Sequence, residues 1–111
     1  MSSKQHDLLP LTPAVFHILL TLAAGPRHGY AIMKEVAEQT DGELRLGPGK
    51  LYYSIQRMLE EGLIEEVAGA EHANNRRPYR ITAAGRAAAR AEARRLHKTL
   101  RLAADRHLIE D

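Results

Sequence analysis

The chain has 111 residues, of which 44% are hydrophobic and 27% charged, and it contains no cysteine. This size and composition are typical of one globular domain, and they exclude disulfide scaffolds, thiol nucleophiles and cysteine-based metal sites. No apolar run approaches the roughly eighteen residues that a membrane span needs, and residues 1–10 lack the apolar core of a secretory signal. We therefore expect a cytoplasmic, single-domain protein without a membrane partner.

Charge is distributed unevenly along the chain. Residues 1–75 carry six basic and ten acidic side chains, whereas residues 76–111 carry ten basic and four acidic ones. The net charge of +2 for the whole chain therefore conceals a strongly basic C-terminal part. Such asymmetry indicates binding to a polyanion, and a long solvated helix that is rich in arginine is the alternative explanation.

Three amphipathic helices are predicted in the first half of the chain. The first follows Thr12 as N-cap and Pro13 as first helical residue, the second ends at Gly42, and the third ends at Gly62. Residues 43–46, between the second and third helices, alternate in polarity and fit either an extended linker or one small strand. The apolar residues that recur at helical spacing are Val15, Ile18, Leu19 and Leu22; Ile32, Met33, Val36 and Ala37; and Leu51, Ile55, Met58 and Leu59.

A β-hairpin is predicted after the third helix, because the periodicity of apolar residues changes from 3.6 to 2. Residues 63–67 and 78–82 each have the pattern of a short strand, and the segment between them has the composition of a hairpin loop. Alternation places Tyr79 and Ile81 on one face and Arg80 on the other. We therefore expect the hairpin to pack one side on the helices and to point Arg80 outward.

The last segment predicts one long helix. Thr82 can cap it, and from Ala83 to about Leu108 the chain has no proline and is dominated by alanine and arginine. About twenty-five residues at 1.5 Å each give close to 40 Å, which is too long to lie wholly on a body of this size. Its apolar residues alternate at spacings of four and three, as in a coiled coil, which predicts pairing with a second copy. The predicted dimer interface consists of Ala89, Ala93, Leu96, Leu100 and Ala103.

Together these elements predict a mainly α fold with a small β-hairpin. Three helices followed by a hairpin give a winged helix-turn-helix, in which the third helix enters the DNA major groove and the hairpin, or wing, contacts the backbone. We expect a flexible N-terminal lead at 1–10, a winged-helix DNA-binding domain at 11–82 and a C-terminal dimerisation helix at 83–111. A winged helix also serves as a protein-interaction module, so the fold alone does not decide the function.

The third helix presents DNA-compatible side chains opposite its apolar stripe, with Gln56 at the flank. Lysine and arginine neutralise phosphates or bind guanine, and tyrosine and serine donate hydrogen bonds to phosphates or bases. Arginines in the wing favour DNA over protein, because an apolar exposed wing would favour a protein partner. A solvated face that holds one lysine and one arginine is the alternative. The predicted DNA contacts are Lys50, Tyr53, Ser54, Arg57, Arg76, Arg77 and Arg80.

Catalytic and metal sites are not indicated by the sequence. Ser54 lacks the context of a nucleophile elbow, and no glycine loop of the phosphate-binding kind occurs. No histidine pair has the i, i+4 spacing of a helical zinc site, so we expect neither a metal, a cofactor nor an enzyme. The long basic helix has an apolar side made mostly of alanine, which is weak for a membrane-surface helix. The six histidines are His6, His17, His28, His72, His97 and His107.

Three motifs occur in order and in register across residues 11–86: His28-Gly29-Tyr30-Ala31-Ile32, then Gly49-Lys50-Leu51-Tyr52 leading through Arg57-Met58-Leu59-Glu60-Glu61-Gly62-Leu63-Ile64, then Tyr79-Arg80-Ile81-Thr82-Ala83-Ala84-Gly85-Arg86. In this arrangement the chain resembles the PadR-like transcriptional regulators. The resemblance implies a bacterial or archaeal repressor that binds operator DNA through a winged helix. It also implies a homodimer built by the C-terminal helix, in the short form with a single such helix.

The resemblance has two departures on the predicted DNA-reading face. The family usually has threonine where this chain has Lys50 and proline where it has Tyr53, so the operator of its relatives does not carry over. Tyr52 matches the family tyrosine, and we expect it either to contact a phosphate or to close the core. The resemblance also implies a small-molecule effector, aromatic or cationic, near the dimer interface. Its identity stays open, because the chain has no tryptophan and one phenylalanine, Phe16.

Overall fold

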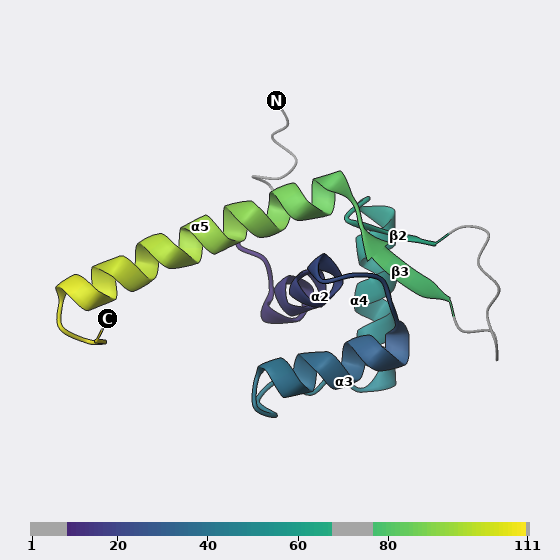
Figure 1. The fold of residues 1–111 in the computed structure, drawn as a ribbon, viewed down its shortest axis with the longest axis horizontal. Helices are drawn as coiled ribbons and strands as arrows, with labels where there is room; N and C mark the ends of the chain where they lie inside the picture. The colour runs from purple at the N-terminus through teal and green to yellow at the C-terminus, as the bar shows by residue number, and fades with distance from the viewer. Residues whose placement is uncertain (1–8, 68–76, 111) are drawn as a thin grey trace.

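A computed structural model describes residues 9–67 and 77–110 of the chain. It is mainly helical with a small antiparallel sheet, which confirms the predicted fold class (Figure 1). Most of the predicted lead at 1–10 and most of the hairpin loop lie outside the described residues. The elements are α2 (Pro13–Ala23), β1 (Arg27–His28), α3 (Gly29–Gln39), α4 (Pro48–Glu60), β2 (Ile64–Glu66), β3 (Pro78–Ile81) and α5 (Ala83–Asp105).

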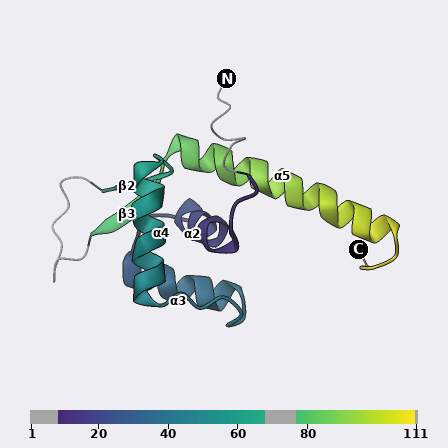
Figure 2. The same cartoon turned by 180° about the vertical axis from the view of Figure 1, so that it is seen from behind.

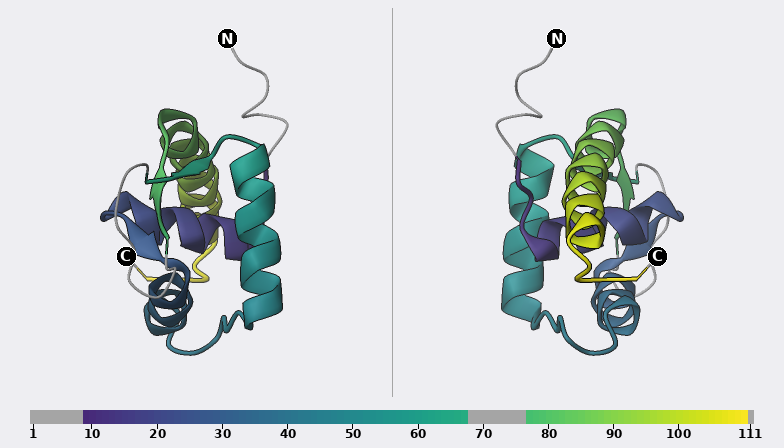
Figure 3. Two further views of the ribbon diagram at one scale, coloured as in Figure 1. Left: turned by 90° about the vertical axis from the view of Figure 1, so that its right-hand side faces the viewer. Right: turned by 90° about the vertical axis from the view of Figure 1, so that its left-hand side faces the viewer.

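The core lies between α2, α3 and α4, with α2 in contact with every other helix (Figure 3). Eight of the twelve apolar stripe residues predicted from the sequence are buried, and the other four are half-buried at the edges of the core. Each fully buried aliphatic side chain contributes about 1.5–3 kcal/mol relative to an exposed one. The half-buried stripe residues are Val15, Met33, Ala37 and Leu59.

Three helices end in the same way, with a residue of positive φ after the C-cap. These residues are Asp41 (φ 52°), Gly62 (φ 76°) and His107 (φ 65°). In each case the following amide donates a hydrogen bond back into the last turn, as Leu63 does to the Met58 carbonyl at 2.9 Å. This turn stops α5 three residues earlier than the sequence predicted, because a histidine adopts a conformation that usually favours glycine.

The sheet has the strand order β1-β3-β2 and is antiparallel throughout. The two predicted hairpin strands are confirmed, and β3 has Arg80 exposed between half-buried Tyr79 and Ile81. The sequence analysis missed β1, which has only two residues and pairs Arg27 with Tyr79. Residues 43–46 form a linker and no strand. Because β1 leads directly into α3, the base of the wing is joined to the helix-turn-helix.

The first half of α5 packs on the body, and the second half extends away from it on the side opposite the wing (Figure 1). Gly85 and Ala88 are buried, and a Cβ at Gly85 would collide with the carbonyl oxygen of Leu63.

Glu92 in α5 is only 2% exposed. Its Oε1 accepts a hydrogen bond from the backbone amide of Leu11 at 3.1 Å, and Arg95 donates to both carboxylate oxygens. The hydrogen bonds from Arg95, and after them the one from the Leu11 amide, hold the pKa of Glu92 below its usual value.

Candidate nucleic-acid interface

Helix α4 lies along one edge of the body, with its outer side uncovered by other elements (Figure 3). Gly47 is its N-cap and Pro48 its first residue. Leu51, Ile55 and Met58 lock the inner face into the core. The exposed side chains of the outer face are Lys50, Tyr52, Tyr53, Gln56 and Arg57.

Ser54 does not belong to this outer face. The residue is 9% exposed and lies beside Leu51, Ile55 and Met58, so the prediction that it points outward is wrong. The physical reason is helical geometry, since Ser54 is three residues after Leu51 and four before Met58, which places it on their side of the helix. Gln56 was predicted to lie only at the flank of this face. It is exposed, as Tyr52 and Tyr53 are, and it takes the place on the outer face that was predicted for Ser54.

Arg57 is held along the surface of α4 by its neighbours one turn away on either side. Its Nη1 donates to the Tyr53 hydroxyl at 3.3 Å, and its Nη2 lies 3.5 Å from Glu61 Oε2. The hydrogen bond to Tyr53, followed by that to Glu61, raises the pKa of Arg57 above its ordinary value. Both contacts are long and exposed, and such pairs contribute little free energy. The guanidinium is therefore oriented but easily released to a phosphate or a base.

Tyr52 packs against the start of α3. A Cβ at Gly29 would collide with the Tyr52 hydroxyl and ring, which explains why the helix begins with glycine at this position. Burial, followed by the neighbouring Tyr52, raises the pKa of Tyr79 in β3. Tyr52 therefore lies at the junction between α3, α4 and the wing, outside the hydrophobic core. Its residue remains 49% exposed, and a phosphate contact stays a prediction.

The wing carries its arginines in pairs with glutamates of β2. Arg80 Nε lies 2.7 Å from Glu65 Oε2, its direct partner across the strands, and Arg77 Nη1 lies 2.8 Å from Glu66 Oε1. All four side chains are exposed, so the predicted outward direction of Arg80 is confirmed. Arg76 lies outside the described residues. The described part of the wing is therefore charged but locally neutral.

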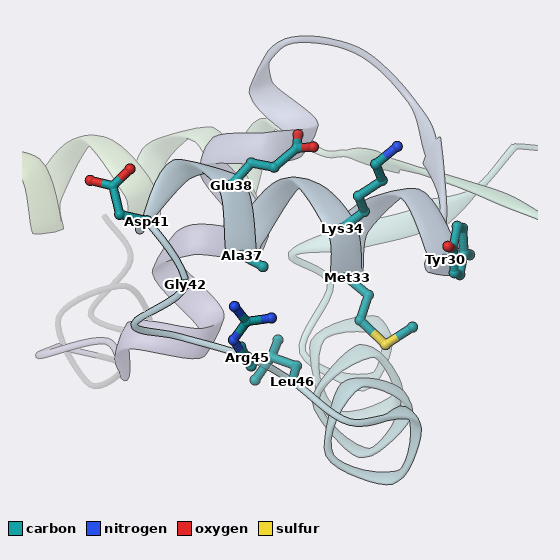
Figure 4. Close-up of a pocket in the computed structure, with 9 residues that line it drawn as sticks. All are labelled: Tyr30, Met33, Lys34, Ala37, Glu38, Asp41, Gly42, Arg45 and Leu46. Atoms are coloured by element: carbon teal, nitrogen blue, oxygen red, sulfur yellow. The ribbon is translucent and has the colours of Figure 1, made fainter.

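Away from α4 and the wing, the described surface beside α3 carries no excess of positive charge. A hollow of about 580 Å³ lies between α3 and the loop that follows it (Figure 4). Two cationic and two acidic side chains line it and offset each other, namely Lys34, Arg45, Glu38 and Asp41. Within residues 9–67 and 77–110, no group of three metal-ligating side chains occurs. No helix in the same residues is long and apolar enough to cross a membrane.

Several solved structures share this fold. A transcriptional regulator from Clostridium thermocellum is 25% identical with a TM-score of 0.68, over 90% of this chain and 96% of that chain. RosR from H. salinarum is 28% identical with a TM-score of 0.64, over 85% and 78% of the two chains. A PadR family regulator from Clostridium difficile has a TM-score of 0.73 at 22% identity, over 85% and 97% of the chains, which shows a common fold.

At the level of sequence, one relative is a 37.1 kDa protein of transposon TN4556 from Streptomyces fradiae, 42% identical over 69 residues. The match covers 62% of this chain and 19% of that protein, so the aligned part is about a fifth of its length. Residues 18–91 match the family described as transcriptional regulator PadR-like. The match covers the second half of α2, all of α3, α4 and the three strands, and the start of α5. The protein therefore belongs to the PadR-like family of winged-helix, DNA-binding transcriptional regulators.

Proposed function

We propose that the protein represses transcription as a homodimer on an inverted-repeat operator, with α4 reading bases in the major groove and the wing contacting phosphates. One observation carries the proposal, namely the exposed polar face of α4 on a helix whose opposite face is buried. A rigid helix can hold side-chain rotamers against base edges, whereas exposed ion pairs on a hairpin suit phosphate contacts. Repression is the activity that the family resemblance implies.

The homodimer is supported by the second half of α5. Leu96 and Ala103 are half-buried and Leu100 is exposed, on a helix that continues past the body (Figure 2). Apolar residues at coiled-coil spacing favour burial against a second copy. Ala89, at the start of the predicted interface, packs partly against the chain's own core, so the interface we propose is centred on Leu96 and Leu100.

Binding of DNA from upstream of the protein's own gene tests the function. We expect a shift of this duplex in gel electrophoresis at protein concentrations that leave a scrambled duplex of equal length unbound. The site should be an inverted repeat with half-site centres about one helical turn, or a multiple, apart. Absence of binding at low salt, or equal binding to both duplexes, would contradict the proposal and favour a winged-helix protein-interaction module.

Sedimentation of a variant with Leu96→Asp and Leu100→Asp tests the dimer. Two carboxylates in a buried seam cost several kcal/mol each unless they are paired, so we expect a folded monomer. The control carries Lys98→Asp and Arg101→Asp, two exposed positions on a different face of α5, and should remain dimeric. Dimers of equal stability in both variants would show that the interface lies elsewhere.

In this role the protein acts in the cytoplasm, where bacterial and archaeal chromosomes lie, and it has no catalytic activity. The support for both statements is the family itself, since its members regulate transcription. The family resemblance also implies that a small-molecule effector controls DNA binding, but it does not identify the effector of this protein.

A further inference from the structure

A groove of about 620 Å³ lies between the segment that leads into α2 and the outer flank of α4. This volume is within the range of about 300–1,000 Å³ that is typical of small-ligand sites. Its floor is aliphatic and includes buried Leu11, Ala14, Met58 and Leu63. The groove thus offers an apolar slot directly beside the helix that we propose reads DNA.

Ser54 contributes a hydroxyl group to the lining of this groove. The residue lines the groove and is more than nine-tenths buried. The hydroxyl oxygen is not among the fully buried side-chain atoms that lack a partner in the described residues, so it is open to the groove. A ligand with an oxygen acceptor could take a hydrogen bond from it.

The rim of the groove is cationic. Lys50 and Arg57 line it together with Tyr53, and Glu61 is the acidic residue among them. Arg57 forms a weak ion pair with Glu61 at 3.5 Å, whereas the Lys50 ammonium makes no ion pair with the described residues. One anionic group at the rim would therefore balance the local charge and could accept hydrogen bonds from lysine, arginine and Ser54.

We propose that this groove binds a small aliphatic carboxylate, with its tail on the floor and its carboxylate at Lys50, Arg57 and Ser54, and that the bound ligand excludes DNA. The described floor is made of leucine, alanine, valine and methionine, and Tyr53 is the aromatic residue at its rim, so an alkyl tail fits better than a ring. The exclusion of DNA rests on the proposed function, because it requires that Lys50 and Arg57 contact the operator. Ligand binding itself does not.

Calorimetric titration of the full chain without DNA tests the site, with octanoate as the probe. We expect octanoate to bind at least tenfold more tightly than octanol or octylamine, because only the carboxylate matches the cationic rim. Equal binding of octanoate and octanol, or no binding of octanoate, would overturn the proposal. If the partner's chain occupied the groove, octanoate would bind only to the monomeric Leu96→Asp, Leu100→Asp variant, which would also overturn it.

Matched variants locate the ligand. Val15 lines the groove at its α2 side, and Val15→Glu should weaken octanoate binding severalfold by charge repulsion, while Val15→Gln of equal length should not. Ser54→Ala removes one hydrogen bond to a charged group and should weaken binding about tenfold. Equal affinities of the Val15→Glu and Val15→Gln variants, or an unchanged affinity of Ser54→Ala, would place the ligand elsewhere.

Competition between octanoate and DNA tests whether the bound ligand excludes the operator. At constant ionic strength, octanoate at ten times its dissociation constant should weaken operator binding about tenfold, and octylamine should have no such effect. If octanoate binds the protein and the operator affinity does not change, the exclusion is wrong although the site stands. If neither the operator duplex nor the scrambled duplex is bound in the absence of octanoate, the proposed function fails. The calorimetric result still decides whether the ligand site exists.

Discussion

Helix α4 and the wing both carry exposed arginines, but they hold them differently. In α4, Arg57 makes two long contacts at 3.3 and 3.5 Å, to a neutral phenol and to one carboxylate. In the wing, Arg77 and Arg80 each form a short ion pair with a glutamate, at 2.8 and 2.7 Å. The number of basic residues is therefore a poor measure of the positive charge that each element offers to DNA.

The difference separates two tasks. A guanidinium that is oriented by weak contacts can exchange them for a bidentate contact with guanine at small cost. An arginine paired with a glutamate must either leave that partner or carry it toward a phosphate that repels it. We therefore expect α4 to provide most of the specificity and the wing to provide an anchor that its own carboxylates weaken.

The largest effect is expected from Arg57→Ala. Loss of a direct base contact should weaken binding to the cognate duplex by roughly ten- to a hundredfold and to a scrambled duplex much less. Parallel titrations of both duplexes measure this ratio, and Tyr53→Phe serves as a control that removes the hydroxyl orienting Arg57 while keeping the charge. Equal weakening on both duplexes would mean that Arg57 contacts a phosphate.

A gain of affinity is expected when Glu65 and Glu66 are both changed to glutamine. This change keeps the size of the side chains but releases Arg77 and Arg80, and it removes two negative charges near the DNA. We expect binding to tighten by about two- to fivefold for each released pair, on cognate and scrambled duplexes alike. The dependence of log K on log salt should become steeper. An unchanged salt dependence would show that the described part of the wing does not meet DNA.

The smallest effect is expected from Arg77→Ala alone, because Glu66 already offsets its charge. Both duplexes should be bound about twofold more weakly, with a salt slope that falls by less than one per protomer. In the Glu66→Gln background the same substitution should have a larger effect, and the double-mutant cycle measures the coupling. A loss confined to the cognate duplex would reverse the assigned roles and make the wing the reader.

Helix boundaries were the most predictable part of this fold, because they depend on local chemistry. Thr12 caps α2 through its hydroxyl, Pro13 starts that helix and Gly62 ends α4, as the sequence predicted. The strand β1 was missed because two residues carry no periodicity. The end of α5 was misplaced because His107 takes a left-handed conformation for which the sequence has no glycine signal.

The site was predictable in outline only, because its details depend on contacts between segments far apart in the chain. The pairing of Arg80 with Glu65 follows from strand register, which the hairpin loop does not specify. The burial of Ser54 required its exact position around α4, although its spacing from Leu51 and Met58 was a usable signal. A charged residue in an alanine-rich helix, such as Glu92, is expected in solvent until its partner amide is known.

The contact between Glu92 and the Leu11 amide has a consequence for how such a regulator changes its targets. In the proposed homodimer, this buried carboxylate helps to set the angle between each winged helix and α5, together with the packing of Gly85 and Ala88. The distance between two half-sites would then depend on a residue remote from DNA, while base preference depends on α4. Operator spacing and operator sequence can consequently diverge independently, each through substitutions that leave the other intact.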